Sequence, residues 1–196
     1  MKPPPKARPR PGSGSVHIVV APNAFKETFL PQEAARLIAK GLRRALPRAR
    51  LTLIPLADGG DGTLDALRAS LGGRKVRVRV RGPLGDPVNA YYLRAGKTAV
   101  IEMARASGLR LVPPRKRNPL LSSTRGTGEL IKHAWDHGAR RILLGVGGSA
   151  TVDGGAGALE VVTPEMARHI TVLCDVENPL LGPTGAAAVF GPQKGA

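Results

Sequence analysis

Aspartates and glycines follow three apolar runs of this sequence, in positions where chemistry with phosphate is expected. Segment 57–63 reads ADGGDGT, segment 143–157 reads LLGVGGSATVDGGAG, and segment 172–179 reads VLCDVENP. Carboxylates are hard oxygen ligands for Mg²⁺, and glycine-rich turns expose backbone N–H groups that bind phosphate. The three segments together predict a site for a Mg²⁺-phosphate ligand, whose carboxylates are Asp58, Asp61, Asp153 and Asp175.

Each segment taken alone also has a simpler interpretation. A single aspartate is often the cap of a helix or turn, and Ca²⁺ is an alternative ligand for Asp58 and Asp61, although the EF-hand spacing is absent. Segment 143–157 contains no P-loop, and Ala150 stands where a dinucleotide-binding fingerprint has its last glycine. A single segment considered alone would favour these simpler interpretations. The presence of three segments of the same kind favours a ligand site.

Two further charged residues belong to the same set of candidates. Lys26 follows the first apolar run and is expected to face the same crevice, where it would neutralise a phosphate or a substrate carboxylate. Glu102 ends another apolar run, and its type and place fit a general base, a helix cap or a salt-bridge partner.

Alternating strands and helices are expected to position these residues. Strand, helix, strand and helix follow one another from residue 16 to residue 71, which favours a doubly wound, mostly parallel sheet. Ligands of such sheets bind beyond the carboxyl ends of the strands, so the three segments are expected to converge there. Strands are expected at 16–21, 51–56, 140–146 and 169–175, and helices at 31–45, 63–71 and 123–137.

A β-rich stretch interrupts this order. Arginines alternate with Val76, Val78 and Val80, as in a half-exposed strand, and two more strands are expected at 88–93 and 98–103. These patterns predict a disordered basic tail at 1–15, a parallel α/β domain made of 16–73 and 123–196, and the β-rich part of a second domain at 74–122.

Composition limits the classes of function. The chain has 196 residues, 42% of them hydrophobic, and a formal net charge of +16 that suggests nucleic-acid binding as an alternative function. Nucleic acid is nevertheless an unlikely partner, because the basic residues are scattered and only 3% of residues are aromatic. The single Cys174 excludes an internal disulfide, and the chain has neither a membrane-spanning stretch nor a secretory signal, so we expect a cytoplasmic location.

Eight short motifs in order resemble the bacterial glycerate kinase family, whose members open with a strand followed by A-P-D-S-F-K-G. They cover nearly everything from Val16 to Ala196. The matching residues are 21–26, 57–63, 82–85, 101–109, 126–131, 147–155, 175–179 and 190–196.

This resemblance implies ATP-dependent phosphorylation of D-glycerate with Mg²⁺, on two α/β domains of which one is flavodoxin-like. As hypotheses, Asp58 and Asp61 would hold the metal and Lys26, Asp58, Asp153 and Asp175 would act in catalysis, and which aspartate accepts the hydroxyl proton is left open. The residues expected to bind the nucleotide are Gly59, Gly60, Gly62, Thr63, Gly147, Gly148, Ser149, Gly154 and Gly155, and those expected to bind the substrate are Glu102, Ser107, Thr127 and Asn178.

The chain departs from the family pattern at single positions and in length. Asn23 stands where Asp is frequent, Glu27 where Gly is frequent, and Val152 where Asn is usual. Family members carry a sizeable segment where Glu160 here passes directly to residues 161–164, and they continue beyond Ala196. We therefore expect an incomplete second domain, and a catalytically dead, nucleic-acid-binding remnant is the alternative to an active kinase.

Overall fold

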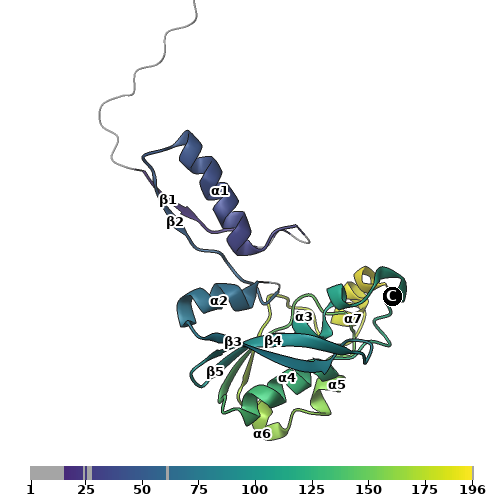
Figure 1. Ribbon diagram of the computed structural model, residues 1–196. Coiled ribbons are helices and arrows are strands. Elements are labelled where there is room, and N and C mark those ends of the chain that lie inside the picture. The colour runs from purple at the N-terminus through teal and green to yellow at the C-terminus, as the bar shows by residue number, and fades with distance from the viewer. Residues whose placement is uncertain (1–15, 24, 26–27, 61, 196) are drawn as a thin grey trace, which may run out of the picture. The chain divides into compact units, whose positions relative to one another are not determined.

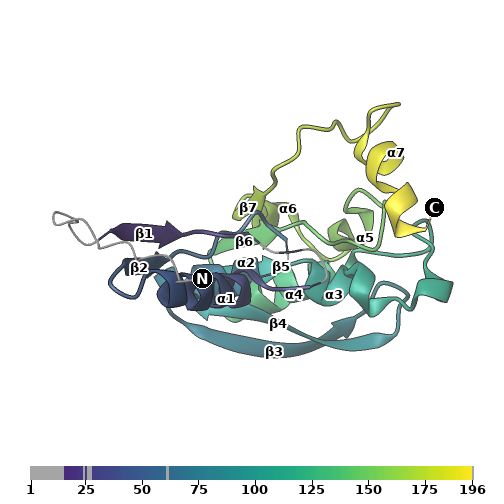
Figure 2. The same cartoon turned by 90° about the horizontal axis from the view of Figure 1, so that it is seen from above.

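The computed structural model describes residues 16–23, 25, 28–60 and 62–195, and its contacts divide the chain between Pro55 and Leu56. Both units are drawn in Figure 1 and, turned by 90°, in Figure 2. The predicted tail at 1–15 and the candidates Lys26 and Asp61 lie outside the described residues.

The first unit is a strand-helix-strand motif. Strands β1 (His17–Val20) and β2 (Arg50–Leu53) pair in parallel, with Ile18 opposite Leu51. Helix α1 (Pro31–Ala45) joins them and starts with a proline, whose fixed φ suits the first helical turn. The helix buries Ala34, Ala35 and Ala39, and the strands and helix predicted here are confirmed.

The second unit is built on a five-stranded mixed sheet. The first three strands pair antiparallel, and the last two continue the sheet in parallel, so the carboxyl ends of the last three strands share one edge. In spatial order the strands are β3 (Arg74–Arg81), β4 (Pro87–Ala95), β5 (Thr98–Glu102), β6 (Arg141–Gly145) and β7 (Ile170–Leu173).

Helices cover both faces of this sheet. Helix α2 (Thr63–Leu71) lies on one face and packs Leu64 and Leu67 against strands β4 and β5, whereas α4 (Arg125–Asp136) covers the opposite face (Figure 1). The larger core lies under α4 and includes Tyr92, Ile101, Leu130, Ile131, Ala134 and Ile142.

Short helices connect these elements. Three of them, α3 (Ala104–Ser107), η1 (Leu109–Leu111) and η2 (Pro114–Lys116), follow β5. The remaining ones, after β6 and β7, are α5 (Ala156–Leu159), α6 (Pro164–Ala167), α7 (Ala186–Phe190) and η3 (Pro192–Lys194).

The α/β class is confirmed, and the contacts divide the chain at a different place from the predicted domains. Strand β5, expected in a separate domain, pairs with β6 along its whole length, so 74–122 and 123–196 share one sheet and one core. The contacts instead separate 16–55 from the rest. None of the helices in the described ranges is both long and apolar enough to cross a membrane.

Candidate functional site at the carboxyl edge of the sheet

Glycines bring segment 57–63 into direct backbone contact with the ends of two strands at the carboxyl edge. Gly59 has a φ of +90°, and a Cβ on it would meet the backbone carbonyl of Leu173, the last residue of β7. The Gly147 N–H, just beyond β6, donates to the Gly59 carbonyl at 3.1 Å. Segment 57–63 therefore lies against the ends of both β6 and β7.

Gly145 and Gly147, at the end of β6 and just beyond it, leave no room for a side chain where they contact segment 57–63. A Cβ on Gly145 would strike the Gly59 carbonyl oxygen, and one on Gly147 would lie 2.7 Å from the Gly60 Cα. Real Cβ atoms do not approach backbone so closely, so only glycine permits this contact. The scarcity of side chains after β6 thus has a packing reason that is independent of any ligand.

Glu102 ties segment 57–63 to the end of β5. Its side chain is 1% exposed, and Oε1 accepts the N–H groups of Gly62 at 3.1 Å and Leu64 at 2.8 Å. Oε2 accepts Arg105 Nε at 2.7 Å. Two of the three alternatives for Glu102 are therefore present together, since it caps the first turn of α2 and pairs with Arg105.

The N–H groups of Gly59, Gly60, Gly62 and Thr63 are already engaged within the protein, that of Thr63 with the Gly60 carbonyl at 3.2 Å. Gly59 N–H donates to Thr63 Oγ1 at 3.1 Å, and Gly60 N–H donates to Asp58 Oδ1 at 2.9 Å. The N–H of Gly62 donates to Glu102. Phosphate binding by Gly59, Gly60, Gly62 and Thr63 stays a prediction that would require these bonds to be exchanged.

Gly148 and Ser149 have a different environment. The loop forms an isolated bridge to Gly108, in which Leu109 N–H donates to the Gly148 carbonyl and Ala150 N–H donates to the Ser107 carbonyl, both at 2.9 Å. Within the described part of the chain, the N–H groups of Gly148 and Ser149 have no partner. Together with the exposed Gly154, whose N–H also has no partner in the described ranges, they are the predicted phosphate donors that an anion can bind without breaking an internal bond.

Asp153 holds two helix starts in place. Its Oδ2 accepts the backbone N–H and the hydroxyl of Thr124, both at 2.8 Å, and the N–H of Gly157 at 3.2 Å, while Oδ1 accepts Gly155 N–H at 3.1 Å. Burial raises the pKa of Asp153, but these hydrogen bonds outweigh burial and leave the pKa below its ordinary value. Its carboxylate is thus occupied by the starts of α4 and α5, and the turn that it stabilises runs through Gly154 and Gly155.

The predicted substrate-binding hydroxyls lie inside the fold. Ser107 Oγ and Thr127 Oγ1 are 2.8 Å apart and both buried, where they join α3 to α4. Asn178 donates through Nδ2 to the Thr184 carbonyl at 3.0 Å and fixes the loop after β7. Contact between these three residues and a substrate is not tested by the geometry and stays a prediction.

The candidate carboxylates differ in exposure. Asp58 and Asp175 are exposed, and Asp153 is half-buried. Among the residues that the structure describes, no three His, Cys, Asp or Glu side chains gather closely enough to hold a metal ion. The described ranges therefore offer no ready-made set of three such ligands.

The sequence patterns missed Lys194. Its ammonium is buried and donates to Ser149 Oγ at 2.6 Å and to the Thr151 carbonyl at 2.7 Å. Burial lowers the pKa of Lys194 below its ordinary value, and the charge of Asp153 acts against that shift. No local pattern marks this contact, because 45 residues separate Lys194 from Ser149; the only signal is that Lys194 stands in a family motif.

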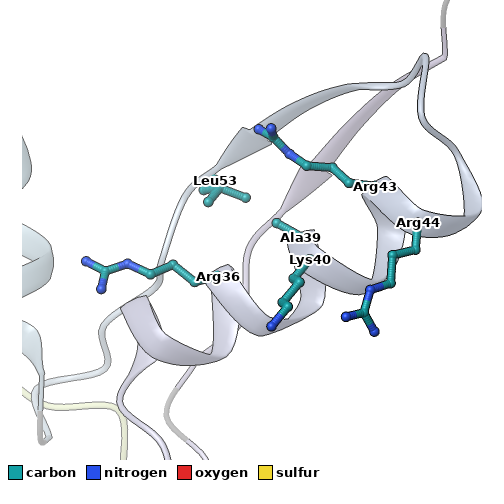
Figure 3. Close-up of a pocket in the computed structure, with 6 residues that line it drawn as sticks. All are labelled: Arg36, Ala39, Lys40, Arg43, Arg44 and Leu53. Carbon is teal, nitrogen blue, oxygen red and sulfur yellow. The ribbon is translucent and has the colours of Figure 1, made fainter.

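The first unit has a groove whose charged lining residues are all basic. It lies between α1 and β2 and is open to solvent (Figure 3). It contains no carboxylate among its lining residues, which are Arg36, Ala39, Lys40, Arg43, Arg44 and Leu53.

Comparisons with known proteins agree on one family. The sequence model described as "Glycerate kinase family" matches residues 18–168 and 161–196. The chain is 48% identical to a glycerate kinase of Halalkalibacterium halodurans and 45% identical to one of Bacillus subtilis, in each case over 91% of this chain and 56% of the relative. A crystal structure of "putative glycerate kinase 2" from Salmonella typhimurium LT2 matches with a TM-score of 0.73 and 43% identity, over 93% of this chain and 58% of that one.

The chain spans slightly more than half the length of the curated relatives that it matches. The family match also comes in two blocks, whose boundary at 161–168 adjoins the junction after Glu160 where the sequence predicts a missing segment.

Proposed function

The chain belongs to the glycerate kinase family, and from that premise we propose that its carboxyl-edge site takes part in transfer of a phosphoryl group from ATP to D-glycerate. The bond from the γ-phosphorus to its bridging oxygen breaks, a bond to a glycerate hydroxyl forms, and the hydroxyl proton passes to a carboxylate. Such a reaction depends on positioning and charge neutralisation more than on covalent chemistry by the protein.

One observation carries the proposal. Segment 57–63 is in backbone contact with the loop after β6 and with the last residue of β7 at one sheet edge. In α/β sheets this edge is where phosphate-bearing ligands bind. The N–H groups of Gly148 and Ser149 are the donors that this arrangement offers to an anion.

The donor set at this edge fits Mg²⁺ bound together with a nucleotide. Mg²⁺ is usually held by one or two carboxylates, with substrate phosphates and water completing its octahedron. The exposed Asp58 and Asp175 would be those carboxylates, whereas Asp153 does not fit, because its oxygens already accept four hydrogen bonds. When bound, Mg²⁺ would neutralise charge on the transferred phosphoryl group.

The remaining charged candidate is Lys26. Its expected partner is an anionic group, either a nucleotide phosphate or the glycerate carboxylate, and this role stays a prediction because Lys26 lies outside the described residues. Proton acceptance from the substrate hydroxyl falls to Asp58 or Asp175, since the pKa of Asp153 is lowered and its oxygens are engaged.

A coupled assay tests the proposal. The full chain is mixed with ATP, Mg²⁺ and D-glycerate, and release of ADP and the position of the phosphate on the product are measured. We expect glycerate-dependent release of ADP, falling about 100-fold in Asp58→Asn and Asp175→Asn, which is the usual scale for losing a group that stabilises transition-state charge.

A matched variant separates the family from the activity of this chain. It joins to this chain, after Glu160 and after Ala196, the parts of the Bacillus subtilis relative that the chain does not match. Turnover by this variant but not by the natural chain would contradict the proposed activity while leaving the site intact. Absence of turnover from both would contradict the proposed site as well.

A further inference from the structure

The end of the described chain returns to the glycine-rich loop after β6. The turn of η3 places the buried ammonium of Lys194 on Ser149 Oγ at 2.6 Å and on the Thr151 carbonyl at 2.7 Å. On its other side the segment is held against η2, since a Cβ on Gly195 would lie 3.2 Å from the Arg117 Cβ. A cation from 45 residues away thus lies directly on the loop that carries the reachable N–H groups.

The loop has few other side-chain restraints. Gly147 and Gly148 have no side chain, and the φ of Gly148 is +73°. Backbone bonds fix the loop through Gly147 N–H, the Gly148 carbonyl and Ala150 N–H, and the Thr151 hydroxyl donates to the Ser122 carbonyl at 2.8 Å. Ser149 is the remaining anchor point, and Lys194 is the residue that binds its side chain.

We propose that Lys194 is a positioning residue that clamps residues 147–151 so that the N–H groups of Gly148 and Ser149 point together at a nucleotide phosphate. This role rests on the proposed function, because it assigns those N–H groups to a phosphate of ATP. It does not require Lys194 to touch the substrate.

Burying an ammonium group removes its hydration, and interactions with neighbouring groups offset this loss for Lys194. The Lys194 side chain makes two hydrogen bonds and lies within the field of Asp153. A charged donor binds a neutral oxygen more strongly than an uncharged one does, which suits a clamp on a loop of small residues. The positive charge beside Ser149 also favours an anion at the neighbouring N–H groups.

The test compares Lys194→Met with the natural chain, using Lys132→Met as a matched control. Lys132 is an exposed lysine of α4 whose ion pair with Asp136, at 2.6 Å, is of the surface kind that contributes little. Ser149→Ala is a second variant, which removes the acceptor and leaves the buried segment in place if Lys194→Met fails to fold.

Two readouts distinguish this role from the proposed function itself. Amide hydrogen exchange without ligand is expected to speed up about tenfold at residues 147–151 in Lys194→Met and Ser149→Ala but not in Lys132→Met, the scale of one charged hydrogen bond. In the kinase assay, the KM for ATP is expected to rise about tenfold while the KM for glycerate stays unchanged.

Unchanged exchange at 147–151 in both test variants would overturn the clamp, even if the chain proves to be an active kinase. Faster exchange together with an unchanged KM for ATP would overturn the link to the nucleotide. In a chain without turnover, the same link is tested by titrating ADP and following thermal unfolding, and an equal ADP response in the natural chain and Lys194→Met would overturn it.

Discussion

Glu102 shows how one buried carboxylate can organise a site without touching a ligand. It connects the end of β5 to the first turn of α2 through two N–H groups and binds Arg105 with its other oxygen. A buried carboxylate with three donors is fully satisfied, so its replacement leaves polar groups without this partner. Glu102 therefore holds segment 57–63 against the end of β5.

Glu102→Gln is expected to lower the free energy of unfolding by about 2 kcal/mol, because the charge-assisted bond to Arg105 is lost in a buried place. Urea unfolding followed by the fluorescence of Trp135, the single tryptophan, measures the change. Glu160→Gln is the matched control, since its carboxylate is 59% exposed. A stability of Glu102→Gln equal to that of the control would contradict the capping role.

The lowered pKa of Asp153 predicts that the free energy of unfolding decreases at acid pH. Its pKa in the folded protein lies below the ordinary value, so its carboxylate stabilises the fold above pH 4 or so, and this contribution is lost as the pH falls through the folded pKa. Asp153→Asn should be less stable at neutral pH by about 1 to 2 kcal/mol, as for other lost helix caps.

The acid-induced loss of stability should also be shallower in Asp153→Asn than in the natural chain. Unfolding experiments between pH 7 and pH 3 check both expectations, with the exposed Asp136→Asn as a control that keeps the natural slope. Parallel curves for Asp153→Asn and the natural chain would show that this carboxylate does not carry the effect.

The contacts of a side chain could be predicted from the sequence only where its hydrogen-bond partner is close along the chain, or where the residue stands in a specific motif. The glycines and aspartates of 57–63 and 143–157 marked two loops that lie in backbone contact, and the three alternatives for Glu102 included the two that occur. Lys194 could not be found in this way, because its partners are 43 and 45 residues away and depend on the path of the chain after β7.

At the scale of elements, the site depends on close contact between loop backbones. A methyl group on Gly147 would lie 2.7 Å from the Gly60 Cα, and neither backbone can move without displacing β6 or α2. Gly147→Ala should therefore destabilise the protein by about 1 to 3 kcal/mol, as overpacking does elsewhere.

Gly41→Ala provides the control for this substitution. Gly41 lies within α1 with nothing within 4 Å of its Cβ position, so alanine there should stabilise the helix by about 0.5 to 1 kcal/mol. Thermal unfolding of both variants measures the two effects, and a neutral or stabilising Gly147→Ala would contradict the contact between segment 57–63 and the end of β6.

The order of strands and helices was predictable because the hydrophobic periods are clear, but their grouping into domains was not. Alternation of arginine and valine in β3 indicated a half-exposed strand, which is equally consistent with a separate domain and with one side of a continuous sheet. The pairing of β5 with β6 decided between them, and pairing partners are not encoded in local periodicity.

At the scale of the whole molecule, the net charge of +16 and the family point to different ligands. A nucleotide site stabilises the folded protein when its ligand binds, whereas binding of nucleic acid through scattered cations weakens steeply with salt. We expect Mg²⁺-ATP to raise the Tm with little dependence on salt between 50 and 200 mM, a range in which contacts to phosphates of nucleic acid weaken sharply. Thermal unfolding in the presence of Mg²⁺-ATP or of duplex DNA compares the two possible ligands. A Tm that rises with DNA but not with Mg²⁺-ATP would contradict the kinase assignment.

The central claim is that three separate loops form one ligand site at the carboxyl edge. Amide hydrogen exchange of the full chain, with and without saturating Mg²⁺-ATP, tests this claim most directly. The account predicts that exchange slows together at residues 58–64, 147–151 and 174–178, with no comparable change in β3. Slowing at only one of these segments, or at none of them while the chain remains folded, would contradict the claim.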